Sequence, residues 1–157
     1  MSEPLFLPDE AATRRLGAAL AAGIAPGRVI FLSGELGTGK TTLVQGLLRA
    51  LGFAGRVKSP TYSLVELYKL SSLNLYHFDF YRFERRSEWA DSGFREYFSQ
   101  DSACVVEWPE RVTGLLAPPD LELRLEFSGP GRRARLTAPT AAGRDWLAAA
   151  LKRWSQA

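Results

Sequence analysis

The sequence predicts an α/β fold with a mixed sheet, in which a parallel core and antiparallel hairpins are flanked by helices. Residues 29–32 are apolar and typical of a buried strand, and residues 40–51 place their apolar side chains on one face of a helix. A glycine-rich loop joins the two. Later in the chain, two pairs of strand-like segments are separated only by short turns and therefore predict hairpins, which make the sheet mixed. These pairs are 62–68 with 75–81, and 121–127 with 133–138.

Turn residues and periodicity place the remaining elements. Asp9 is expected to cap a helix that runs to about residue 22 and ends at Gly23. Asp91-Ser92-Gly93 is expected to interrupt the charged and aromatic stretch of residues 82–100 before a short helix that ends at Phe98. Alternation predicts that one set of side chains in the second hairpin faces the core: Leu121, Leu123, Leu125 and Phe127. The other predicted elements are an edge strand at 5–7, a buried strand at 103–106, and a helix from about 140 with Leu147, Leu151 and Trp154 on one face.

The glycine-rich loop reads Gly34-Glu35-Leu36-Gly37-Thr38-Gly39-Lys40-Thr41, which matches the spacing G-x-x-x-x-G-K-[ST] of a phosphate-binding P-loop. Its glycines allow backbone conformations that a Cβ would block, so that successive N–H groups surround a phosphate at the positive end of the following helix. Lys40 then reaches the β- and γ-phosphates, and the Thr41 hydroxyl ligates Mg²⁺. Chance produces such a match in under about 1% of chains of this length. We therefore predict a P-loop NTPase fold in a single domain that spans residues 1–157.

Two predicted strands carry acidic side chains. Glu107 follows the apolar strand 103–106, as the acid of a Walker B motif does, where it can hold Mg²⁺ directly or through water. In the strand 75–81, His77 and Asp79 fall on one face, and the core-forming aromatic residues Tyr76, Phe78 and Phe80 fall on the other. A solvated face or an internal His–Asp hydrogen bond is the structural alternative to a functional role. Because His77 is the only histidine, a metal-binding histidine pair is excluded.

Composition excludes several classes of protein. No apolar run is long enough for a membrane span, and the N-terminus lacks a basic region followed by an apolar core. Cys104 is the only cysteine, so an intrachain disulfide is excluded, and we expect this thiol to be an inert core residue. These features indicate a cytoplasmic protein without membrane association. The net charge of +3 is too small to argue for nucleic-acid binding by itself.

A P-loop alone does not identify an activity. A GTPase should carry Asn-Lys-x-Asp and Asp-x-x-Gly, but the only asparagine, Asn74, precedes Leu75, and no Asp-x-x-Gly occurs. The Ser-Gly-Gly signature of transporter-type ATPases is also missing. Two alternatives to an ATPase remain: a small-molecule kinase with Arg82, Arg85 and Arg86 in an arginine-rich lid, and a nucleotide-binding regulatory module without turnover.

Four motifs occur in the order and spacing of a known family. They are Gly34-Glu35-Leu36-Gly37-Thr38-Gly39-Lys40-Thr41-Thr42, Val57-Lys58-Ser59-Pro60-Thr61-Tyr62-Ser63, His77-Phe78-Asp79-Phe80-Tyr81-Arg82 and Glu107-Trp108-Pro109-Glu110. Together they resemble the TsaE family, formerly YjeE, the bacterial ATPases of tRNA threonylcarbamoyladenosine (t6A) biosynthesis. The resemblance covers nearly the whole chain, including residues 7–10 and Gly131-Arg132-x-Ala134. Ser63 stands where the family often has threonine.

The resemblance implies a P-loop fold with a mixed sheet that binds ATP or ADP with Mg²⁺ and hydrolyses ATP slowly. It also implies the TsaB and TsaD proteins as partners, among which TsaD transfers a threonylcarbamoyl group to adenosine 37 of tRNAs that read ANN codons. The chain itself would supply an ATPase cycle for multiple turnover. It would contact tRNA only indirectly or weakly, and it would be a monomer when alone.

The resemblance also assigns roles to individual residues. Thr41 and Glu107 would hold the metal. Lys40, Thr61 and Asp79 would be catalytic, with Thr61 in a switch-like loop and Asp79 near the γ-phosphate or its water. The phosphate cradle would consist of Leu36, Gly37, Thr38, Gly39, Lys40, Thr41 and Thr42. Three further residues would lie near the nucleotide: Glu10, Glu110 and Arg132.

The residues leave two points of the chemistry open. The attacking water is positioned either by Asp79 or by a backbone carbonyl, with His77 or Thr61 assisting. An arginine that stabilises the transition state comes from Arg82, from Arg132 or from a partner. The stretch Arg82-Arg85-Arg86 with Trp89 is a candidate partner surface, because Arg and Trp are enriched at interface hot spots. Its alternative is a solvated helix start with one core Trp.

Overall fold

In the computed structural model, residues 4–60, 63–84 and 87–156 are described, and the strands among them form one mixed sheet. The strands are β1 (Leu5–Leu7), β2 (Val29–Ser33), β3 (Val65–Lys69), β4 (Asn74–Asp79), β5 (Ser102–Glu107), β6 (Leu121–Ser128) and β7 (Gly131–Thr137). Their spatial order is β1-β7-β6-β2-β5-β4-β3. The central strands β6, β2, β5 and β4 are parallel, whereas β3–β4, β6–β7 and β1–β7 are antiparallel pairs. The predicted mixed sheet, with both hairpins and β1 at an edge, is therefore confirmed.

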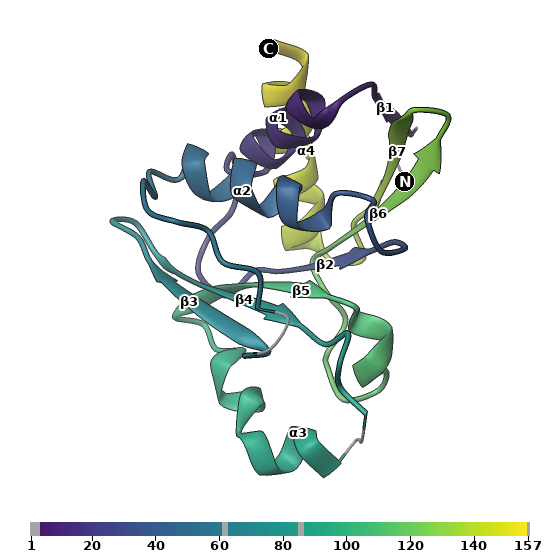
Figure 1. Cartoon of the computed structure of the whole chain (residues 1–157). Coiled ribbons are helices and arrows are strands. Elements are labelled where there is room, and N and C mark those ends of the chain that lie inside the picture. The colour runs from purple at the N-terminus through teal and green to yellow at the C-terminus, as the bar shows by residue number, and fades with distance from the viewer. Residues whose placement is uncertain (1–3, 61–62, 85–86, 157) are drawn as a thin grey trace.

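Helices lie on both faces of the sheet (Figure 1). On one face are α1 (Glu10–Leu20), α2 (Lys40–Ala50) and α4 (Ala141–Gln156), which bury a mainly aliphatic core against the sheet. On the other are α3 (Ser87–Ser92) and the 3-10 helix η1 (Phe94–Tyr97), which cover a second, aromatic core on β4 and β5. A second 3-10 helix, η2 (Pro109–Val112), directly follows β5. None of the helices that the structure describes has the length and apolarity that a bilayer crossing requires.

Close contact between α1 and α2 fixes the loop that precedes α2. A Cβ on Gly17 would lie 2.0 Å from the carbonyl oxygen of Leu43, and one on Gly46 would lie 2.1 Å from that of Arg14. No side chain fits either gap, so glycine is required at both positions. The same packing sets Thr13 of α1 against Gly39, at the start of α2.

Several predicted boundaries are confirmed by their local contacts. The Asp9 side chain accepts a hydrogen bond from the Ala12 N–H at 2.9 Å and caps α1, as expected. Gly93 has φ +72° and separates α3 from η1, where a break was predicted. β3 begins at Val65 and not at residue 62, because Leu64 has φ +69° and donates its N–H to the Pro60 carbonyl in a turn.

One prediction about side-chain burial is wrong, and the structure decides two further points. Phe127 is 50% exposed, because it lies beside the β6–β7 turn, where its ring packs under the Arg132 guanidinium at 4.6 Å. On α4 the fully buried residue is Trp146, which donates its Nε1–H to the Leu20 carbonyl at 2.8 Å. The predicted face of this helix is only partly buried, since α4 turns Trp146 toward α1. Trp89 is buried in the aromatic core, as the alternative to a partner surface predicts.

Cys104 lies in β5 and is 1% exposed, as the sequence predicts. Its Sγ donates a hydrogen bond to the Tyr97 carbonyl at 3.4 Å. Burial raises the pKa of this thiol to about 12. The reactive thiolate is therefore nearly absent from the native protein at neutral pH.

We expect Cys104 to react with a thiol reagent such as Ellman's reagent only when the protein unfolds. The measurement compares the labelling rate in native buffer with the rate in strong denaturant. Labelling of the native protein as fast as that of the denatured protein would contradict the buried position of this thiol.

Candidate functional site

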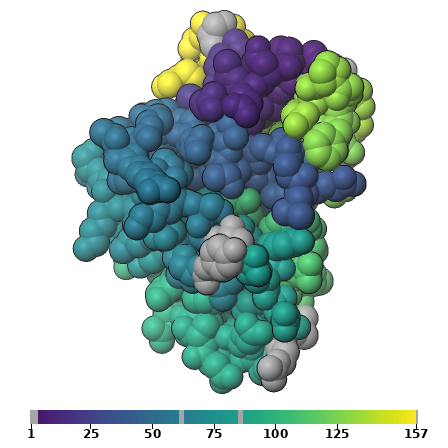
Figure 2. Space-filling model, viewed as in Figure 1, coloured from purple at the N-terminus to yellow at the C-terminus, as the bar shows by residue number. Residues whose placement is uncertain are grey.

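A hollow of about 580 Å³ lies at the edge of the sheet where the parallel strands β2, β4 and β5 end. Segments that are distant in the sequence meet around it: the start of α1, the glycine-rich loop (residues 34–40), the ends of β4 and β5, and the β6–β7 turn. In Figure 2 the surface of the glycine-rich loop, in dark blue, lies directly below that of α1, in purple, and that of the β6–β7 hairpin, in light green. Loops at the carboxyl ends of parallel strands are the usual position of a ligand site in α/β sheets.

The glycine-rich loop is shaped by glycines with positive φ. Gly34 has φ +141°, and a Cβ there would lie 2.4 Å from the Leu125 carbonyl oxygen. Gly39 has φ +104° and turns the chain directly into α2. The backbone N–H groups at the start of α2 have no partners within their helix, so this end of the loop is a favourable place for an anion.

Lys40, the first residue of α2, is only 6% exposed and points its ammonium group back into the loop. Its Nζ donates to the carbonyl oxygens of Gly34, at 2.5 Å, and of Glu35, at 3.2 Å. It also lies 4.5 Å from the centre of the Trp108 ring. Burial lowers the pKa of Lys40, and the nearby carboxylates, Glu107 foremost, oppose that shift. A buried ammonium held only by neutral carbonyls is suited to bind an anion.

Arg132 in β7 contacts the same loop from the other side of the hollow. Its Nε donates to the Thr38 carbonyl, and one of its terminal nitrogens donates to the Gly37 carbonyl, both at 3.2 Å. The loop is therefore held between Lys40 on its inner side and Arg132 at the hairpin.

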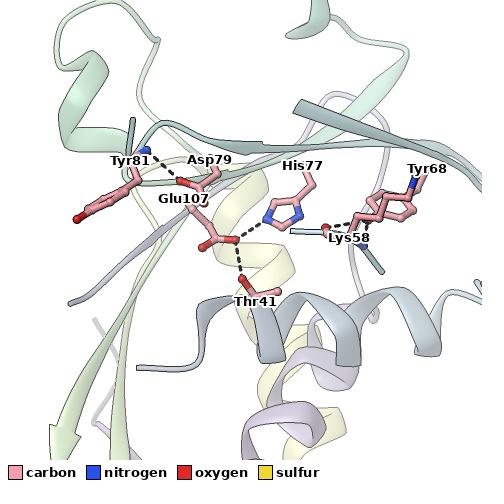
Figure 3. A network of polar contacts seen from close by, with 7 residues as sticks. All are labelled: Thr41, Lys58, Tyr68, His77, Asp79, Tyr81 and Glu107. Atoms are coloured by element: carbon pink, nitrogen blue, oxygen red, sulfur yellow. Dashed lines mark hydrogen bonds and ion pairs between the residues drawn. The ribbon is translucent and has the colours of Figure 1, made fainter. Parts of the chain in front are cut away.

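Two carboxylates lie side by side opposite the start of α2. The register of β4 and β5 places Asp79 directly opposite Glu107, at the ends of two parallel strands. Glu107 Oε2 accepts a hydrogen bond from the Thr41 hydroxyl at 3.4 Å and lies 2.5 Å from His77 Nε2 (Figure 3). Asp79 Oδ1 accepts the Tyr81 N–H at 2.9 Å.

The electrostatics of Asp79 differ from those of an exposed carboxyl group. Burial raises its pKa, and the negative charge of Glu107 acts in the same direction. The hydrogen bond from Tyr81 and the charge of Lys40 oppose the shift without cancelling it. An acid with a raised pKa beside a basic group is typical of a functional site.

The structure brings most of the predicted site residues to this hollow. Those that line it are Glu10, Leu36, Gly37, Thr38, Gly39, Lys40, Thr41, Thr42, Asp79, Glu107 and Arg132. Glu110 lines a neighbouring hollow instead, although its charge acts on Lys40. Thr61 lies outside the described residues, as do Arg85 and Arg86.

Other residues lie at the site without having been assigned to it. Trp108, Tyr81 and Ser59 line the hollow, and the Trp108 and Tyr81 rings lie 4.9 Å apart. Trp108 has φ +57°, a conformation that is uncommon outside glycine and that frequently marks functional sites. The position of Trp108 directly after Glu107 is the sequence feature that could have assigned it to the site. The contact between His77 and Glu107 was not predicted, because a period of two shows a shared face but not a partner on another strand.

Comparisons with known proteins show which family the chain resembles over most of its length. A family model described as "Threonylcarbamoyl adenosine biosynthesis protein TsaE" matches residues 7–135. The tRNA threonylcarbamoyladenosine biosynthesis protein TsaE of Haemophilus influenzae is 37% identical over 149 residues, which cover 92% of this chain and 94% of that protein. The TsaE protein of Bacillus subtilis is 37% identical over 126 residues, or 80% and 77% of the two chains. The crystal structure of Bacillus subtilis YdiB superposes with a TM-score of 0.82 at 27% identity and covers 97% of each chain.

We expect Asp79→Asn to stabilise the isolated protein at neutral pH. A carboxyl group whose pKa is raised by folding contributes most to the free energy of unfolding at low pH, where it is protonated. This contribution is lost as pH rises through the folded pKa. Asparagine avoids that loss and keeps an oxygen for the Tyr81 N–H. The advantage of the variant should therefore grow from below the usual pKa of 3.8 toward neutral pH.

Urea unfolding of both proteins at several pH values measures this difference. Asp91→Asn, at an exposed position of α3, is the matched control and should show no such growing advantage. An Asp79→Asn protein that loses stability relative to the wild type as pH rises would refute the raised pKa.

Proposed function

The chain belongs to the TsaE family of tRNA threonylcarbamoyladenosine biosynthesis proteins, and from this premise we propose that it binds and slowly hydrolyses ATP with Mg²⁺. In this proposal its ATPase cycle supports the transfer of a threonylcarbamoyl group to adenosine 37 of tRNAs that read ANN codons. The transfer itself belongs to TsaD. TsaB and TsaD are the partners, and tRNA is contacted only indirectly or weakly.

The single observation that supports nucleotide binding most strongly is the environment of Lys40. Its ammonium group is buried and rests on two carbonyl oxygens of the glycine-rich loop, beside the open N-terminus of α2. Phosphate oxygens bound at that helix end would give this charge a direct anionic hydrogen-bond partner. The loop would then act as the P-loop that its sequence predicts.

Mg²⁺ fits the oxygen atoms of Thr41 and Glu107. The Thr41 hydroxyl and the Glu107 carboxylate already share a hydrogen bond at the hollow, and both are hard oxygen ligands. No group of three or more His, Cys, Asp and Glu side chains that could hold a metal by itself occurs in the described part of the chain. That is compatible with Mg²⁺, which keeps several waters and is bound through one or two protein groups plus phosphates. When bound, Mg²⁺ would neutralise charge on the β- and γ-phosphates.

Asp79 is the residue that we assign to the attacking water. It lies at the same edge of the sheet as Glu107, and its Oδ1 is fixed by the Tyr81 N–H. A raised pKa makes this carboxylate a better proton acceptor than an exposed one. Asp79 would therefore both orient the water and accept its proton, while Glu107 serves the metal.

The arginines of the site suggest why turnover by the chain alone would be slow. Arg132 already donates to two carbonyls of the glycine-rich loop and so supports the loop. Arg82 lines the hollow and is the arginine of this chain that we assign to the nucleotide. A further charge for the transition state would come from the partner proteins.

We predict that Lys40→Ala reduces the ATP turnover number by about 10²-fold or more, because one preorganised donor to the reacting phosphate is removed. The fold should remain, since Lys40 supports the loop mainly through two hydrogen bonds. Phosphate release and circular dichroism measure the two effects, and Lys69→Ala at the exposed end of β3 is the control. Near wild-type turnover in the Lys40 variant would refute the assignment. Release of phosphate without any added acceptor also separates an ATPase from a kinase.

We also predict that TsaB and TsaD together stimulate ATP hydrolysis. A charge supplied by a partner raises turnover by ~10³ or more in related phosphoryl transfers. Steady-state phosphate release is measured for the chain alone, with each partner, and with both. An unchanged rate would reject partner activation.

The proposal that Arg82, Arg85 and Arg86 form a partner surface is tested in the same assay with a triple alanine variant of these residues. We expect this variant to lose the stimulation, and Arg153→Ala, on the exposed end of α4, to keep it. A triple variant with full stimulation would show that the partner proteins bind elsewhere.

A further inference from the structure

His77 is the only histidine of the chain, and it is completely buried in β4. Its Nε2 lies 2.5 Å from Oε2 of Glu107, the acid at the end of the neighbouring strand β5. The same oxygen accepts the Thr41 hydroxyl. His77 thus contacts the site from behind and does not line the hollow.

The hydrogen bond defines which nitrogen of the ring carries the proton. A carboxylate oxygen accepts, so Nε2 must donate to Glu107. The other ring nitrogen, Nδ1, is buried and has no hydrogen-bond partner in the described part of the chain. A proton on Nδ1 would therefore be buried without an acceptor, which is costly. Of the two neutral tautomers, the geometry therefore favours the one with its proton on Nε2.

The position of His77 in the sheet explains what this bond does. Asp79 is directly opposite Glu107, whereas His77 is two residues earlier on the same face of β4. The bond holds Oε2 of Glu107 on the side of His77 and Thr41. Figure 3 shows the other carboxylate oxygen of Glu107 pointing away from both His77 and Thr41.

We propose that His77 is a positioning residue that holds Oε2 of Glu107 through Nε2–H next to the Thr41 hydroxyl, so that this carboxylate is fixed at the metal position beside Thr41. This inference rests on the proposed function, because it assigns Glu107 to Mg²⁺. Partners that orient a metal-binding carboxylate typically change metal affinity by 10–100-fold when they are removed. His77 therefore acts on the metal through Glu107 and not on the nucleotide.

Because the chain contains one histidine, NMR of protein labelled with ¹⁵N-histidine reports this ring alone. We expect a single tautomer with the proton on Nε2. Addition of ADP with Mg²⁺ should shift the Nε2–H resonance, whereas ADP with a chelator should leave it nearly unchanged. A purely structural histidine would not distinguish the two conditions.

Two variants test the same role by calorimetry with ADP as the probe. His77→Leu removes the donor, and we expect it to reduce the gain in ADP affinity that Mg²⁺ provides by about 10-fold or more. Metal-free ADP affinity should stay within about 2-fold, because the loop and Lys40 are untouched. His77→Gln keeps an N–H donor and should recover most of the gain. Ser102→Ala, a buried change at the start of β5, is the control and should alter neither affinity.

The outcomes separate this inference from the proposed function. If ADP binds but the His77 resonance ignores Mg²⁺, or if His77→Leu loses affinity equally with and without the metal, the positioning role is overturned. A tautomer with its proton on Nδ1 overturns it as well. If ADP does not bind at all, the proposed function fails and this role fails with it. Should His77→Leu not fold, the wild-type resonance and the His77→Gln affinities still decide.

Discussion

The register between β4 and β5 is the constraint on which the candidate site depends. It sets Asp79 opposite Glu107 at the ends of two parallel strands, where neighbouring like charges are unfavourable. The surrounding groups reduce this cost: Lys40 lies nearby, Tyr81 donates its N–H to Asp79, and His77 holds Glu107. A slip of β4 by one residue would turn its Asp79 and His77 side chains to the aromatic face. The two hydrophobic cores, one on each face of the sheet, make that register the only one that buries both sets of apolar residues.

The site concentrates features that reduce the stability of a fold. Four such features lie close together: a buried ammonium, a buried carboxyl group with a raised pKa, a non-glycine residue with positive φ, and a His77 nitrogen without a partner among the described residues. Much of the rest of the described chain follows ordinary rules, with a capped α1, glycines where helices touch, and alternation in β6. Such a contrast is expected where function and not packing has selected the residues. It also explains why the polar network lies at the carboxyl ends of the parallel strands and not along their middle.

Local patterns were sufficient to predict most elements, because caps, glycine stops and alternation act within a few residues. They also placed Asp79 on a shared face with His77 and identified Glu107 from its strand. The misses have a common cause, which is that each depends on a distant element. Phe127 lies beside the hairpin turn, where it packs against Arg132 and stays half exposed. Trp146 is buried because α4 packs on α1. The bond between His77 and Glu107 depends on which strands are neighbours, which no local pattern contains.

The account's central claim is that the glycine-rich loop, Lys40, Thr41 and Glu107 form one site for a nucleotide with Mg²⁺. A crystal structure of the protein with Mg²⁺ and a non-hydrolysable ATP analogue tests it most directly. We predict phosphates at the start of α2, Lys40 Nζ moved from the Gly34 and Glu35 carbonyls to a phosphate oxygen, and the metal between Thr41 and Glu107. A nucleotide bound elsewhere, or phosphates bound at the loop while Lys40 remains on those carbonyls, would contradict it.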